Sequence, residues 1–234
     1  MIANLVTLGN LCSGLLLLYL YSLENMITIN FMCRLILWGS LLDCLDGPIA
    51  RITQTTSSFG ARLDSIADMV SFGFGPVVIL CHISQLLPYN TPVTPIFGLI
   101  WIMVNLYREI ASVKTICGNY HGCPSTFTAG ALAGGLLFLD QSRYNTPEML
   151  EFWMIGAIGW GANIMLDHKK IYRHERLIEL NPVGSLKGGY NFLTLVSILL
   201  SLSFQGWQLG CWAWIWSGYC VFYIFLENEM FRSL

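Results

Sequence analysis

Apolar stretches that are long enough, or nearly long enough, to cross a lipid bilayer follow one another along most of this chain. A transmembrane helix needs about 20 mostly apolar residues to span the hydrocarbon core. Eight stretches come close to that length, at 4–23, 28–51, 60–86, 94–117, 124–141, 147–167, 188–204 and 209–227. The sequence therefore predicts an all-α polytopic membrane protein with about eight transmembrane helices, organised as a single domain over residues 1–234.

Charged residues are scarce, which favours a membrane protein over a soluble one. They make up 11% of the chain, whereas soluble domains carry roughly 25%. The net charge of −2 offers no general basic surface for a nucleic acid. No Lys or Arg precedes Arg34, so we expect the first apolar stretch to be a retained span and not a cleaved signal peptide.

Lysine and arginine gather on one side of the predicted spans. With both termini inside, loops 52–59, 118–123 and 168–187 lie on the cytoplasmic side and collect most of these residues. Among the outer loops, only the one that holds Arg143 carries a basic residue. This asymmetry satisfies the positive-inside rule. It places the C-terminal end of the second span and the start of the third on the cytoplasmic side.

Four of the six aspartates fall in one 26-residue window, as Asp43, Asp46, Asp64 and Asp68. Carboxylates in hydrocarbon are costly and repel one another unless a positive group binds them. At about 100° per residue, the first two share one face of a helix, and the last two share a face of the next helix. The short connector returns the chain to the same membrane surface, so the two faces can meet and form a cation site.

Oxygen ligation by carboxylates alone suits a hard cation such as Mg²⁺ or Mn²⁺, and four carboxylates can hold two ions. Paired metals that bridge a diphosphate neutralise its charge during phosphoryl transfer. Arg51 lies one turn beyond the first acids and can bind phosphate oxygens with its planar fork. Ser57 or Ser58 can cap the third helix, whose positive N-terminus would then face the same anion.

The pattern over residues 43–68, D-x2-D-G-x2-A-R-x8-G-x3-D-x3-D, resembles the signature of the CDP-alcohol phosphotransferase family. The resemblance implies a CDP-linked lipid substrate, two divalent metals, and an acceptor alcohol that displaces CMP. It also implies that Asp68 is the general base for the acceptor hydroxyl. The implied metal ligands are Asp43, Asp46, Asp64 and Asp68, and the implied contacts for cytidine and pyrophosphate are Gly47, Arg51, Ser57 and Gly60. A homodimer in the inner (plasma) membrane of a prokaryote is a further expectation from the resemblance.

Three other segments resemble the branch of this family that transfers a phosphatidyl group from CDP-diacylglycerol to L-serine. They are Asn4 to Gly14, Ser71 to Pro76, and Gly122 to Thr126. That branch usually continues past the arginine of span four with Ala-Arg-Phe-Asn, whereas Arg108 here precedes Glu-Ile-Ala-Ser-Val. The resemblance therefore implies phosphatidylserine and CMP as products. The sequence after Arg108, beside the expected acceptor site, departs from the pattern of that branch.

A serine acceptor brings a carboxylate, which calls for a cation near the metal site. Arg108 and Lys114, near the cytoplasmic end of span four, are the candidates. Alternatively, Arg108 pairs within the surroundings of Glu109, and Lys114 extends to lipid phosphates. On the first span, Asn4, Thr7 and Asn10 recur at three-residue intervals, which suits either hydrogen bonds between helices or contacts with substrate.

Two alternatives to serine transfer remain open. Within the family, glycerol phosphate, inositol phosphate, free inositol or choline could be the acceptor, although the phosphorylated acceptors call for more cationic groups around the site. Intramembrane carboxylates also occur in transporters of metal ions or protons. Transport is disfavoured because the acids lie at one membrane face instead of the midplane, and because Arg51 beside them suits an anionic ligand.

Overall fold

The computed structural model describes residues 2–23, 27–55, 57–88, 93–113, 120–121, 125–140, 142, 145–166 and 171–172. Its helices are α1 (Ile2–Ser22), α2 (Ile29–Ile52), α3 (Ser58–Asp68), η1 (Met69–Phe74), α4 (Gly75–Gln85), α5 (Val93–Val113), α6 (Ser125–Asp140) and α7 (Pro147–Leu166). Two-residue strands, β1 (Tyr120–His121) and β2 (Ile171–Tyr172), pair antiparallel.

The helical fold class is confirmed, and each of the first six predicted spans corresponds to one helical rod. The third rod joins α3, η1 and α4 without a break over 58–85. By length and composition, the rods Ile2–Ser22, Ser58–Gln85 and Val93–Ile110 can cross a membrane, and α6 is a shorter apolar helix. The predicted spans 188–204 and 209–227 lie outside the described residues, so the total of eight stays a prediction.

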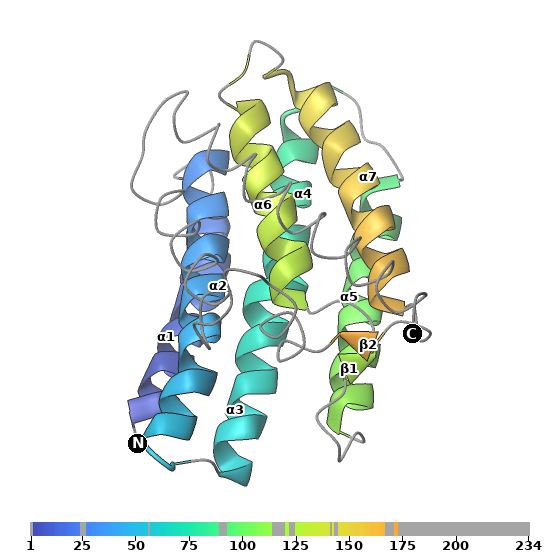
Figure 1. Ribbon diagram of the computed structural model, residues 1–234. Coiled ribbons are helices and arrows are strands. Elements are labelled where there is room, and N and C mark those ends of the chain that lie inside the picture. The colour runs from blue at the N-terminus through green and yellow to red at the C-terminus, as the bar shows by residue number, and fades with distance from the viewer. Residues whose placement is uncertain are drawn as a thin grey trace, which may run out of the picture.

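Successive rods run in alternating directions and form a bundle (Figure 1). Helix α2 packs against α1 on one side and α6 on the other, while α5 packs against α7. The start of α1, the end of α2 and the start of α3 consequently lie at one end of the bundle (Figure 1). The second and third rods thus meet at a common end through a short connector, as the sequence indicated.

Small residues allow α1 to pack closely against η1, which follows the last aspartate of the motif. A Cβ atom added to Gly14 would lie 2.6 Å from Ser71 Oγ and 2.9 Å from Ser71 Cα, so only glycine fits this crossing. Ser71 Oγ donates a hydrogen bond to the Asn10 carbonyl at 2.9 Å. These contacts hold the polar face of α1 against the aspartates of α3.

The π-helix η1 is anchored from the opposite side by α5. Trp101 is fully buried, and its indole Nε1 donates a hydrogen bond to the Phe72 carbonyl at 2.8 Å. π-Helical turns are rare and occur frequently at functional sites. Here the π-helical segment begins at Met69, directly after Asp68, and it is clamped between α1 and α5.

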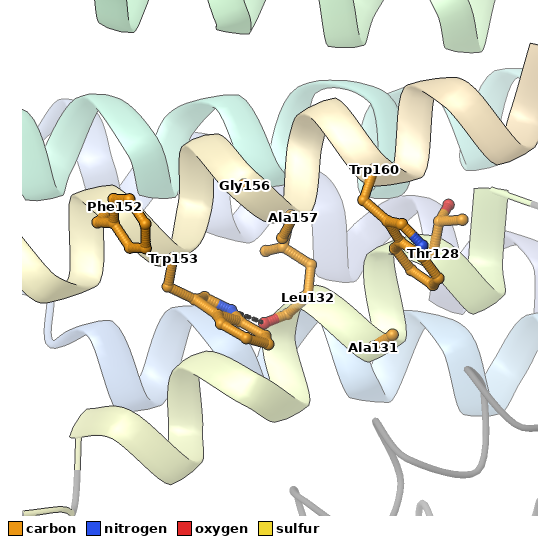
Figure 2. A pocket seen from close by; sticks show the side chains of 8 residues that line it. All are labelled: Thr128, Ala131, Leu132, Phe152, Trp153, Gly156, Ala157 and Trp160. Atoms are coloured by element: carbon orange, nitrogen blue, oxygen red, sulfur yellow. Dashed lines mark hydrogen bonds between the residues drawn. The ribbon is translucent and has the colours of Figure 1, made fainter.

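An apolar cavity of about 320 Å³ lies between α6 and α7 (Figure 2). Within the part of the chain that the structure describes, its lining residues all come from these two helices: Thr128, Ala131, Leu132, Phe152, Trp153, Gly156, Ala157 and Trp160. The Trp153 indole donates to the Leu132 carbonyl at 3.4 Å, and this bond fixes the ring beside the cavity. None of the motif aspartates lines this cavity, so the cavity is separate from the motif.

Candidate active site

Three carboxylates from two helices converge beside the end of the bundle where α2 joins α3. Asp43 comes from α2, and Asp64 and Asp68 come from α3. One oxygen atom from each lies within 4.8 Å of the other two. The carboxyl groups of Asp43 and Asp68 also face each other, as do those of Asp46 and Asp64. The structure thereby gathers the four predicted ligands into two facing pairs, with Asp46 outside the tight group of three.

Neutral donors from the surrounding helices hold three of these carboxylates. Thr126 Oγ1 of α6 donates to Asp43 Oδ2 at 2.7 Å. Thr7 Oγ1 of α1 donates to Asp46 Oδ2 at 2.6 Å. Asn10 Nδ2, one turn further along α1, donates to Asp68 Oδ1 at 3.3 Å. Each bond orients one carboxylate oxygen without adding a charge, which is how an outer layer of residues positions metal ligands.

Asp64 lacks such a donor at one of its oxygen atoms. Within the described part of the chain, Asp64 Oδ1 is buried and has no hydrogen-bond partner. A buried acceptor left unpaired costs about 1–3 kcal/mol, and more when it is charged. A divalent cation held between Asp43, Asp64 and Asp68 would satisfy this atom, and all the donor atoms are the hard oxygens that Mg²⁺ and Mn²⁺ prefer. The residues present therefore fit a divalent metal.

Helix α5 brings a pair of opposite charges to the same place. Arg108 Nη2 and Glu109 Oε1 lie 3.3 Å apart, and their side chains are 12% and 14% exposed. The charge of Arg108 acts on Asp43, while that of Glu109 acts on both Asp64 and Asp68. The alternative interpretation of Arg108, an ion pair in the surroundings of Glu109, is thus present in the structure. Its role toward the acceptor stays a prediction.

The remaining predicted site residues lie around the connector between α2 and α3. Ser57 Oγ accepts a hydrogen bond from Gly60 N at 3.0 Å and caps α3, which confirms the predicted cap. Gly47 is exposed on α2, and Arg51 belongs to the last turn of that helix. Lys114 lies outside the described residues.

A Cβ atom added to Gly60 would lie 3.0 Å from Asn4 Oδ1. Within the described residues, Asn4, Thr7 and Asn10 of α1 therefore all face the motif, and the last two bind its carboxylates directly. Sequence reasoning noted their three-residue spacing but did not pair them with the aspartates. It also missed the contact of Thr126 with Asp43, for which the only signal was a hydroxyl in the first turn of a short apolar span.

The family model described as CDP-alcohol phosphatidyltransferase matches residues 1–165. Curated relatives named CDP-diacylglycerol–serine O-phosphatidyltransferase are similar over shorter stretches. The protein of Methanocaldococcus jannaschii is 43% identical over 79 residues, which cover 34% of this chain and 34% of that protein. The Helicobacter pylori (strain J99) protein is 38% identical over 76 residues, covering 32% and 31%. The Mycobacterium tuberculosis (strain H37Rv) protein is 34% identical over 170 residues, covering 65% and 55%. The aligned part of this chain thus spans about a third of the first two relatives and about half of the third.

Proposed function

Because this chain belongs to the CDP-alcohol phosphatidyltransferase family, we propose that it transfers the phosphatidyl group of CDP-diacylglycerol to L-serine, giving phosphatidylserine and CMP. The observation that carries the proposal is the convergence of Asp43, Asp64 and Asp68 from two helices of the motif. The names of the curated relatives support serine as the acceptor. The whole of residues 1–234 would form one catalytic domain.

Two divalent ions, Mg²⁺ or Mn²⁺, would be held by Asp43, Asp46, Asp64 and Asp68. Bound there, they would neutralise the diphosphate of the lipid nucleotide and stabilise the leaving CMP. The contacts from Thr7, Asn10 and Thr126 support this assignment because they fix carboxylate orientations without competing as charged partners.

Asp68 would act as the general base. Its Oδ1 accepts a hydrogen bond from the Asn10 amide, and its second oxygen would take the proton of the serine hydroxyl. The serine oxygen then forms a bond with the phosphorus on the lipid side, and the bond from that phosphorus to CMP breaks. Transfer in this way is direct and needs no covalent intermediate on the protein.

The CDP group would bind at the junction of α2 and α3, through Gly47, Arg51, Ser57 and Gly60. The N-terminus of α3, capped by Ser57, carries the partial positive charge that favours a phosphate. Arg108, and Lys114 beyond the described residues, would bind the serine carboxylate. The site would face the cytoplasm at the plasma membrane of a prokaryote, in a chain that would act as a homodimer among membrane lipids.

The decisive experiment supplies purified protein with CDP-diacylglycerol, Mg²⁺ or Mn²⁺, and one acceptor at a time. Serine should release CMP and yield phosphatidylserine, whereas glycerol phosphate, inositol phosphate, inositol and choline should not. Absence of CMP release with serine would refute the proposal. Flux of metal ions or protons through liposomes, without any lipid product, would instead identify a transporter.

A further inference from the structure

Glu109 is a fifth acidic side chain beside the aspartates, and the reaction above gives it no role. Its charge acts on Asp64 and Asp68 while its carboxylate pairs with Arg108. Like charges gathered in a weakly hydrated site repel one another, and the repulsion is stronger than in water because the dielectric is low. The anionic phosphates of the donor would gain nothing from an additional carboxylate on α5, and this one is engaged by Arg108.

A free amino acid carries both charges that this pair complements. Its carboxylate and its ammonium group are attached to the same carbon, so they are close neighbours of opposite sign. Arg108 Nη2 and Glu109 Oε1 are likewise neighbours, 3.3 Å apart, on a helix that packs against η1 of the catalytic rod. When the carboxylate of an amino acid lies beside Arg108 and its ammonium group lies beside Glu109, each of the four charges has a neighbour of opposite sign.

We propose that Glu109 binds the ammonium group of the acceptor, so that Arg108 and Glu109 together select a zwitterionic amino acid. The inference rests on the proposed function, in which the site binds the carboxylate of serine, and adds that the site also binds the ammonium group. Both side chains are mostly buried, and charge-assisted hydrogen bonds are strong where water is largely excluded.

The same carboxylate sets what the site rejects. Glycerol phosphate and inositol phosphate bring a doubly charged anion and no ammonium, so Glu109 repels them. Free inositol carries no charge for either member of the pair, and choline carries no anionic group for Arg108. A site that penalises the wrong acceptors in this way is selective beyond its affinity for the right one.

The first test uses the unmodified protein with two analogues of serine. 3-Hydroxypropionate is serine without its ammonium group, and serinamide replaces the carboxylate by a neutral amide. Both should be poorer acceptors than serine, with kcat/KM lower by about tenfold to hundredfold. If 3-hydroxypropionate is used as well as serine, the role of Glu109 is refuted, although the proposed function stands. If the protein releases no CMP with serine itself, the role of Glu109 and the proposed function are both refuted.

The second test is Glu109→Gln, which keeps the size of the side chain and removes its charge. It should raise the KM for serine about tenfold to hundredfold and erase the preference for serine over 3-hydroxypropionate. The KM for CDP-diacylglycerol and the half-saturating metal concentration should stay within about twofold. Arg108→Gln should instead erase the preference for serine over serinamide.

Glu148→Gln is the matched control, since Glu148 is exposed in the first turn of α7, at the opposite end of the bundle (Figure 1). It should leave all three constants unchanged. An increased metal requirement in Glu109→Gln, with the KM for serine unaltered, would make Glu109 part of the metal site and overturn the inference. Should Glu109→Gln fail to fold, Glu109→Asp retains the charge and should still prefer serine to 3-hydroxypropionate.

Discussion

Thr126 of α6 donates a hydrogen bond to Asp43 of α2, with 2.7 Å between Thr126 Oγ1 and Asp43 Oδ2. The two residues are 83 positions apart in the chain. The bond joins α6 to α2, one of the two helices that carry the motif, and it fixes the orientation of the Asp43 carboxylate. The geometry of the carboxylates therefore depends on a residue outside the motif.

Replacing Thr126 by valine should impair metal binding without unfolding the chain. Valine keeps the shape of threonine but cannot donate, so Asp43 loses the bond that orients it. Loss of such an outer partner typically costs about tenfold to hundredfold in metal affinity or activity. The half-saturating Mg²⁺ or Mn²⁺ concentration in the CMP-release assay measures this effect. Thr128→Val is the control, because Thr128 Oγ1 donates to the Ser125 carbonyl and not to one of the four motif aspartates.

Substitution of Asp68 by asparagine should abolish transfer to every acceptor. The amide cannot take a proton from the attacking hydroxyl, and general bases contribute about a hundredfold to ten-thousandfold to rate. The measurement is kcat for CMP release at saturating serine and metal. Asp140→Asn, an aspartate at the far end of α6, should retain normal kcat. Residual transfer above one tenth of the unmodified rate would exclude Asp68 as the base.

Close packing between α1 and η1 should make Gly14 intolerant of any side chain. In Gly14→Ala the new Cβ would meet the Ser71 backbone at 2.9 Å, and overpacking of this kind costs about 1–3 kcal/mol. Thermal unfolding in detergent should show a lowered Tm. Gly156→Ala offers the comparison, since a Cβ there meets no atom of the described residues within 4 Å, and its Tm should be unchanged or slightly raised. Equal behaviour of the two variants would contradict the packing argument.

The spacing of the aspartates was sufficient to predict that α2 and α3 bring their acids together, because helical periodicity is local and the connector is short. The Ser57 cap was predictable for the same reason. The pairing of Asp43 with Asp68 and of Asp46 with Asp64 was not, since it depends on the relative rotation of two helices. The contact of Thr126 with Asp43 was not predictable either, because it follows from the packing of α6 against α2.

The π-helical turn after Asp68 could not be foreseen either. It depends on tertiary contacts, with Trp101 donating to the Phe72 carbonyl from α5 and Ser71 bonding to α1. Family resemblance indicated Arg108, but Glu109 is the first residue at which the sequence departs from the branch pattern, so no pattern gave it a role. Residues of this kind are identified only when a structure places them beside the charges they act on.

Removal of divalent metal should destabilise the fold as well as stop the reaction. Without a cation, Asp43, Asp64 and Asp68 repel one another and Asp64 Oδ1 stays unpaired. A ligand that binds only the folded state stabilises it by about 2.7 kcal/mol at one hundred times its dissociation constant. Addition of Mg²⁺ or Mn²⁺ to chelator-treated protein should therefore raise Tm, and Asp64→Asn should reduce the increase. Asp140→Asn should keep the full increase in Tm. If added metal does not change the Tm of the unmodified protein, no cation binds at these carboxylates.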